Sequence, residues 1–169
     1  MAYARTTDLD DFLSRCRAST RTFYEYWDSK RHGRPMPARN DLDPVEMKSW
    51  LVSVQLVDVQ NEQGRFVYRL AGQREIEVRG YNPVGKSVEE AFVGYHVKEA
   101  LKNYEMVVAR KSFVYDWADY LSPSGMRLKQ EALLLPLSDD GRNVNVIVTY
   151  AETDEPYLNF ETAAQRASA

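Results

Sequence analysis

The sequence predicts an α+β domain built on a five-stranded antiparallel sheet. Five segments are rich in branched and aromatic residues, many of them alternating, which favours strands. The connections inside the first pair and the last three of these segments are short turns of Gly, Asn, Asp and Ser, so neighbouring strands should run antiparallel. A stretch with helical periodicity separates the two groups, and a long amphipathic helix precedes both.

The length, charge and cysteine content are those of an ordinary globular domain. The 169 residues are 44% hydrophobic, which is enough for one domain with helical additions. A net charge of −3 gives no electrostatic reason to expect nucleic acid. The single cysteine, Cys16, excludes an internal disulfide and fits a reducing compartment. We see no signal peptide and no apolar stretch long enough to cross a bilayer. We therefore expect a cytoplasmic protein without membrane or nucleic-acid partners.

The N-terminal part, residues 1–35, should hold one long helix from about Asp8 to Arg31. Its apolar side chains recur every three or four residues, and Gly33 and Pro35 provide a stop after the last turn. The apolar stripe either packs on the domain's own sheet or offers a coiled-coil-like surface to a partner. A homodimer through this helix is the assembly we expect. The interface candidates are Leu9, Leu13, Cys16, Phe23 and Trp27.

The sheet domain should occupy residues 36–155, followed by a polar tail at 156–169. A capping box at Asp43–Glu46, with proline at the first helical position, predicts a short helix there. Pro136 implies an edge position or a bulge in its strand. The expected strands cover residues 53–59, 66–71, 112–121, 127–137 and 143–151. The second main helix should cover residues 95–111.

Residues 80–87, GYNPVGKS, match the phosphate-binding pattern G-x-x-x-x-G-K-[ST]. A phosphate-binding loop of this kind needs a buried strand before it and a substantial helix after it. Here a polar segment with helical spacing precedes Gly80, and Gly94 interrupts the helical pattern that follows Ser87. We therefore interpret Lys86 as a residue of a crossover loop and not of a nucleotide site.

Four segments carry a resemblance to a known family: PARNDLDPVEM, YRLAGQ, GYNPVGK and LLLPLSDDGRNVNVIV. Together with the order of two strands, helices and three strands, they resemble PAS domains over residues 36–152, in particular small stand-alone bacterial PAS-like proteins. The resemblance implies a PAS-like sheet with a helical crossover on one face. It also implies a non-enzymatic sensory or adaptor role, exerted on an unidentified signalling protein because no output domain fits in the remaining residues.

The same resemblance implies a pocket under the helical crossover, for a small organic ligand that the sequence does not identify. The rings proposed to line it would equally suit a filled core. Haem would need an axial ligand, and His32 and His96 lie in a linker and at a helix start. Cys16 lies outside the expected core, which argues against cysteine–flavin photochemistry. The pocket candidates are Tyr68, Leu70, Phe92, Tyr104, Tyr115 and Trp117.

A small acid–base enzyme is the alternative function. A carboxyl group with a raised pKa in an apolar pocket can act as a general acid or base. Asp116 and Asp119, on either side of Trp117, are the candidates. Strand alternation nevertheless predicts that Asp116 faces outward while the aromatic residues of this strand, Phe113, Tyr115 and Trp117, face inward. Two histidines and one cysteine make no zinc site.

Overall fold

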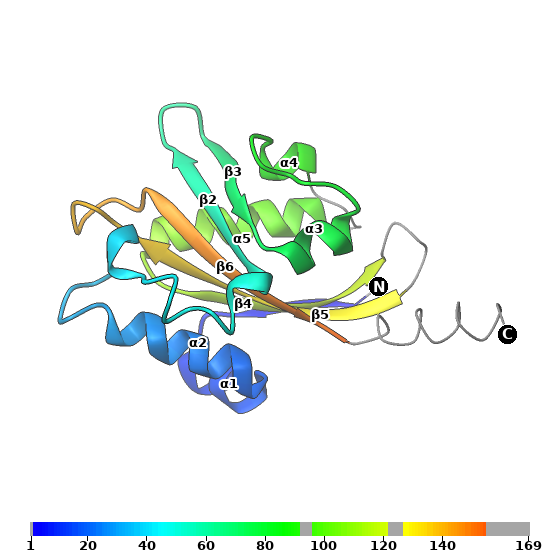
Figure 1. Ribbon diagram of the computed structural model, residues 1–169, viewed down its shortest axis with the longest axis horizontal. Helices are drawn as coiled ribbons and strands as arrows, with labels where there is room; N and C mark the ends of the chain where they lie inside the picture. Colours follow the sequence, from blue (N-terminus) through cyan, green and yellow to red (C-terminus); the bar gives the residue numbers. More distant parts are fainter. Residues whose placement is uncertain (1, 92–95, 122–126, 155–169) are drawn as a thin grey trace, which may run out of the picture.

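An antiparallel sheet of six strands, in the order β1-β4-β5-β6-β2-β3, forms the centre of the molecule (Figure 1). The computed structural model describes residues 2–91, 96–121 and 127–154. The predicted antiparallel arrangement of two strands, helices and three strands is confirmed, with one additional N-terminal strand. The strands are β1 Tyr3–Thr6, β2 Val54–Gln60, β3 Arg65–Ala71, β4 Val114–Leu121, β5 Arg127–Leu137 and β6 Val146–Thr153.

Helices cover both faces of this sheet. The first two helices lie on one face, and the three helices of the crossover lie on the other (Figure 1). No helix of the described residues is long and apolar enough to cross a bilayer. The helices are α1 Leu9–Arg15, α2 Ala18–Ser29, α3 Gln73–Arg79, α4 Val88–Ala91 and α5 Val97–Arg110, with short 3-10 turns at Arg39–Asp41 and Leu51–Ser53.

Strand β1 was not predicted from the sequence. It pairs with the edge of β4, with Tyr3 opposite Ala118 and Thr6 opposite Tyr115. Four residues are too few to show a hydrophobic pattern, and pairing across more than a hundred residues of chain leaves no local signal. Through this strand, Tyr3 reaches the crossover face of the sheet.

The expected single N-terminal helix is two helices with a break at Cys16 and Arg17. Both residues have extended backbone angles, with ψ of 155° and 157°. The break directs the Arg17 N–H at the carboxylate of Glu131 in β5, at 3.2 Å from Oε1. Glu131 is 6% exposed and also accepts a bond of 2.7 Å from the Thr20 hydroxyl. A buried carboxylate needs such donors, and a continuous helix would have used the Arg17 amide internally.

The apolar stripe of these helices packs on the chain's own sheet. Phe23 and Trp27 are 1% and 4% exposed, and the Trp27 indole N–H donates to the Pro136 carbonyl at 3.0 Å. Leu13 and Cys16 are partly buried against the same cluster, whereas Leu9 is 41% exposed. The sequence left two alternatives for this stripe, packing on the domain's own sheet or a surface for a partner. In the structure the stripe packs on the chain's own sheet. Phe23 and Trp27 therefore offer no free surface to a partner while α2 is docked.

A second apolar cluster fills the crossover face, with Val57, Tyr68, Val107 and Ile147 among its buried members. Burial on both faces explains why β5 carries an apolar run instead of an alternating pattern. Pro136 lies beyond the end of the β4 pairing and opposite Ile147, so it occupies a locally open edge, as predicted.

One local prediction differs from the structure, whereas the interpretation of residues 80–87 as a crossover loop agrees with it. Residues 44–50 form successive turns, not a helix, although the Asp43 side chain does accept a bond from Val45 N at 2.8 Å. The crossover loop is tied to β3, because Tyr68 exchanges backbone bonds with Gly85 and Lys86. The Lys86 ammonium lies 4.8 Å from the centre of the Tyr81 ring. Helix α3 precedes this loop, so the strand–loop–helix setting of a phosphate site is not formed here.

Candidate functional site

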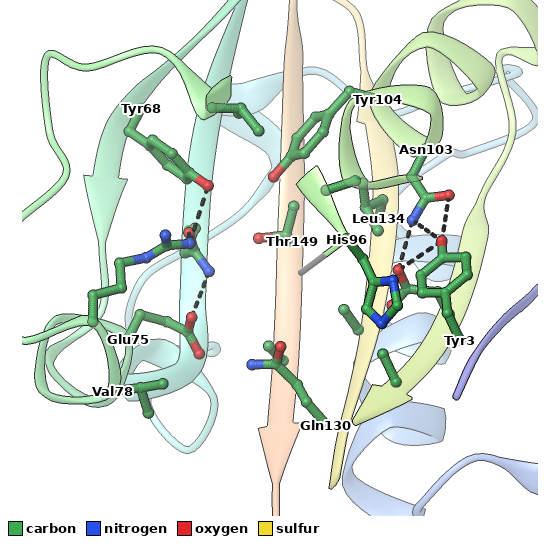
Figure 2. Close-up of a pocket in the computed structure, with 18 of the residues that line it drawn as sticks. Tyr3, Tyr68, Glu75, Val78, His96, Asn103, Tyr104, Gln130, Leu134 and Thr149 are labelled. Carbon is green, nitrogen blue, oxygen red and sulfur yellow. Dashed lines mark hydrogen bonds between the residues drawn. The ribbon is translucent and has the colours of Figure 1, made fainter. Parts of the chain in front are cut away.

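A cavity of about 100 Å³ lies between the sheet and helices α3 and α5 (Figure 2). Its floor includes small side chains on three adjacent strands: Ala118 of β4, Ala132 of β5 and Ala151 of β6. Ala132 is opposite both Asp116 and Ala151 in the sheet register. Methyl groups do not fill the space between sheet and helices, which leaves the hollow.

Helix α3 forms one wall and places Glu75 there. The helix lies close to the chain before β2, because a Cβ on Gly72 would stand 2.4 Å from the carbonyl oxygens of Leu51 and Val52. Glu75 is 4% exposed, and the Gln55 amide donates to its Oε2 at 2.7 Å. Burial raises the pKa of Glu75 to about 7, although the positive charge of Arg79 opposes the shift.

Arg79 organises the same wall. Its guanidinium donates to the Tyr68 hydroxyl at 3.0 Å, to Gln55 Oε1 at 3.3 Å and to the Ala91 carbonyl at 2.8 Å. The guanidinium also lies 4.9 Å from the centre of the Tyr68 ring. These contacts connect α3 to β2, β3 and α4, so the positive charge is fixed within a network of protein groups.

Asp116 occupies the opposite wall. Its Oδ2 accepts bonds from the Tyr3 hydroxyl at 3.1 Å and from the Asn103 amide at 2.6 Å. The Arg5 guanidinium donates to Asn103 Oδ1 at 2.7 Å and so orients the amide. Burial raises the pKa of Asp116 to about 6, and the bonds from Tyr3 and Asn103 limit the rise. Arg5 also pairs with Glu99 of α5.

Polar groups without partners lie between the two walls. Thr149 is 4% exposed, and within the described residues its hydroxyl has no hydrogen bond. The same is true of His96 Nε2, whose ring lies 5.2 Å from that of Tyr3. Figure 2 shows Thr149 and Gln130 between Glu75 on one side and Tyr3 on the other. Such groups are costly in a dry site and suit a polar ligand or water.

The six pocket candidates from the sequence fall in different places. Tyr68 and Tyr104 line the cavity. Tyr115 and Trp117 lie on the other face of the sheet and line a more open hollow of about 380 Å³ beside Arg15. Leu70 is 38% exposed and is not part of the lining, and Phe92 lies outside the described residues.

The outward orientation predicted for Asp116 is wrong. Alternation correctly separates Asp116 from Tyr115 and Trp117, but the aromatic residues face α1 and the aspartate faces the cavity. A strand covered on both faces has no solvent side, so alternation alone does not say which face holds a site. Asp119 also borders the cavity, and its Oδ2 accepts a bond of 3.2 Å from Ala2 N.

The other residues of the site carry only weak signals in the sequence. Glu75 and Arg79 are charged residues of a short helix, where solvent exposure is the ordinary expectation. Thr149 and Ala132 belong to strands that read as continuous apolar core. Only the closely spaced Gly72 and Gly80, which mark a tightly packed helix and its left-handed end at φ 80°, could have drawn attention to α3.

The family model for the PAS domain matches residues 15–150. The chain belongs to the PAS domain family. Its match begins within α1 and so includes α2, which packs on the sheet. Comparison with curated proteins gives no match.

Solved light-oxygen-voltage domains share this PAS fold. A domain from a flavin-analogue study has a TM-score of 0.52 at 13% identity, covering 74% of this chain and 94% of its own. The dark structure of the Aureochrome1 photoreceptor domain also has a TM-score of 0.52, at 12% identity, covering 76% and 95%. The Rhodobacter sphaeroides LOV protein has a TM-score of 0.50 at 13% identity, covering 73% of this chain and 74% of its own. These similarities show the PAS fold.

The residues of this cavity do not fit a flavin. Pockets for ligands of that size measure roughly 300–1,000 Å³, whereas this cavity has about 100 Å³. The chain has a single cysteine. Cys16 packs with the cluster on the other face of the sheet, so no cysteine borders the cavity. Among the described residues, no group of three His, Cys, Asp or Glu side chains could hold a metal ion.

Proposed function

We propose that this PAS domain is a sensor whose input is a small polar molecule bound in the cavity and whose output is a change in protein contacts. The observation that carries the proposal is the unpaired, buried hydroxyl of Thr149, on the sheet beside the alanines that line the cavity. A cavity of about 100 Å³ that contains such groups is suited to a molecule of a few heavy atoms.

The connection from the cavity to Tyr3 supports an output through the N-terminal segment. Tyr3 belongs to β1, which leads directly into α1, and its hydroxyl bonds to Asp116 at the cavity wall. A ligand that competes for Asp116 weakens this attachment and shifts the population in which β1 leaves β4. The contacts that respond are those of a second copy or of an unidentified signalling protein, with the exposed Leu9 beside β1 as a starting point.

Native mass spectrometry of freshly purified protein tests the input. We expect an additional mass from a small molecule that disappears on denaturation. Ala132→Leu should remove it by filling the floor, while Ala132→Ser, which adds a single oxygen atom, should retain it. A bound molecule that survives Ala132→Leu in a folded protein would place the binding elsewhere and contradict the proposal. The same spectra report the oligomeric state and so test the proposed homodimer.

A small acid–base enzyme is the second candidate, because Asp116 has the property such chemistry requires. Its pKa is raised to about 6, within reach of the pH at which a general base works best. An enzyme of this class should turn over a small substrate with a rate that follows the ionisation of Asp116 and is lost in Asp116→Asn. Binding without turnover across a panel of small molecules would instead favour the sensor.

A further inference from the structure

The charges around the cavity are predominantly negative. Glu75, Asp116 and Asp119 border it, against the guanidinium of Arg79 and the imidazole of His96. The positive charge of Arg79 is directed at Tyr68, Gln55 and a backbone carbonyl. A bound anion would therefore face two carboxyl groups, and a bound cation would compensate them.

Each of the two carboxyl groups, that of buried Glu75 and that of half-buried Asp116, keeps one oxygen atom for a ligand. The bonds to Asp116 end on Oδ2, and the bond to Glu75 ends on Oε2. Within the described part of the chain, Asp116 Oδ1 and Glu75 Oε1 make no hydrogen bond. The buried Thr149 hydroxyl, which can donate or accept, and His96 Nε2 are further unpaired groups of this lining. The two carboxyl oxygens are acceptors when ionised, and they select a molecule with N–H donors.

The two carboxyl groups belong to different ends of the cavity. Glu75 is held by Gln55 of β2, and Asp116 belongs to β4, with β5 and β6 between these strands. Three strand spacings, about 14 Å, separate the backbones of β2 and β4, and the side chains of Glu75 and Asp116 both line the space between. A molecule that reaches both walls must be elongated and carry a donor group at each end.

We infer that the cavity takes a short aliphatic diamine, with one ammonium group on Glu75 and the other on Asp116. This inference rests on the proposed binding of a small molecule in the cavity. The aliphatic chain of such a molecule lies over the methyl groups of Ala132 and Ala151, and the Thr149 hydroxyl accepts from one ammonium. The volume of about 100 Å³ restricts the chain to a few carbon atoms.

Proton release accompanies this binding. Without a ligand, burial keeps the pKa of Glu75 at about 7 and that of Asp116 at about 6. An ammonium group favours the ionised form of each, so diamine affinity rises as pH increases from 5.5 to 8. Other charged or titratable groups lie near these carboxyls: Arg79, Arg74 and Glu152 act on Glu75, and Arg5 and Tyr3 act on Asp116. His96 and Asp119 also border the cavity.

Isothermal titration calorimetry with 1,4-diaminobutane, 1-aminobutane, butanoate and succinate tests the inference. We expect the diamine to bind, with about tenfold lower affinity for the monoamine and no binding of either acid. Glu75→Gln and Asp116→Asn should each lower diamine affinity by about tenfold or more. Glu77→Gln, an exposed acid of the same helix, should leave it unchanged. Titrations in buffers of different ionisation enthalpy should reveal the released protons.

The outcomes separate this inference from the proposed function. An acid that binds and is excluded by Ala132→Leu, with no diamine binding, overturns the diamine and leaves the sensor intact. Diamine binding that both carboxyl variants retain, or that Ala132→Leu does not affect, places the diamine outside the cavity and overturns the inference. Failure of every probe, with no small molecule in the native mass spectrum, removes both proposals. Thermal unfolding checks each variant, and if one carboxyl variant does not fold, the other and the proton release decide.

Discussion

The Tyr3 hydroxyl donates a hydrogen bond to the Asp116 carboxylate at 3.1 Å, although 113 residues separate them in the chain. The phenol has one proton and a second possible acceptor, Asn103 Oδ1, also at 3.1 Å. Because Arg5 already donates to that amide oxygen and the Asn103 amide donates to the phenol oxygen, the phenol proton belongs on Asp116. The strength with which the N-terminal strand is held therefore depends on whether Asp116 is ionised.

Replacing this phenol tests that attachment. Tyr3→Phe should reduce the free energy of unfolding by about 1–2 kcal/mol at pH 8, where Asp116 is charged, and by less at pH 5, where it is protonated. The pKa of Asp116 should rise above its value of about 6. Denaturant unfolding and a carboxyl NMR titration measure the two effects. Tyr26→Phe, which alters a hydroxyl bonded to Glu46 at the surface, is the matched control and should leave Asp116 unaffected.

Because the pKa of Glu75 is raised on folding, we expect the stability of the protein to decrease as pH increases. Its pKa is raised from 4.5 to about 7 on folding, so between these values the folded state holds a proton that the unfolded state has lost. Stability is therefore highest below pH 4.5 with respect to this group and declines as pH rises to 7, by about 3 kcal/mol in total. Asp116 contributes a decline in the same direction between 3.8 and about 6.

Glu75→Gln should flatten the part of this profile that extends to pH 7 and should make the protein more stable at pH 8. Chemical unfolding at closely spaced pH values is the measurement. Glu77→Gln, on the exposed side of α3, should preserve the wild-type profile. A wild-type stability that rises steadily from pH 5 to pH 7 would show that Glu75 is ionised in the folded state and would contradict the assignment.

Two threonines should respond in opposite directions to the same substitution. Thr149→Val removes a buried hydroxyl that has no partner among the described residues, so we expect the ligand-free protein to gain about 1 kcal/mol. Thr20→Val removes a hydroxyl that donates to buried Glu131 at 2.7 Å and should cost about 1–3 kcal/mol. Thermal and denaturant unfolding of both variants make the comparison. Equal losses would mean that the Thr149 hydroxyl is satisfied by water.

Two aromatic residues on the α1 face of the sheet should respond differently to loss of the ring. Phe12 is fully buried, and Phe12→Ala should cost about 3–5 kcal/mol. Trp117 is partly exposed beneath the Arg15 guanidinium, 4.2 Å from its ring, so Trp117→Ala should cost clearly less. Both residues lie away from the cavity, and both variants should retain whatever ligand the wild type binds. Loss of the ligand in a folded Trp117→Ala variant would mean that Trp117 does line the ligand site, as the sequence predicted.

The sequence predicted the elements of the sheet far better than the site. Alternation and turn residues located β2 and β3, and the apolar run of residues 133–137 located β5, because these patterns arise from local geometry. The break at Arg17 exists to satisfy Glu131, and β1 exists because β4 offers an edge, so both depend on residues far away in the chain. Burial of Glu75 likewise depends on how closely α3 approaches the sheet, which composition does not reveal.

Because alanine side chains line the sheet side of this cavity, its size can change without a change in the backbone of the sheet. Ala118, Ala132 and Ala151 engage their neighbours through backbone bonds, which no exchange of side chain interrupts. Replacement by glycine deepens the space, and replacement by valine or leucine reduces it in small steps, while the carboxyl groups at either wall stay in place. Substitutions at these three positions would therefore change the volume of the cavity while the backbone hydrogen bonds of the sheet remain.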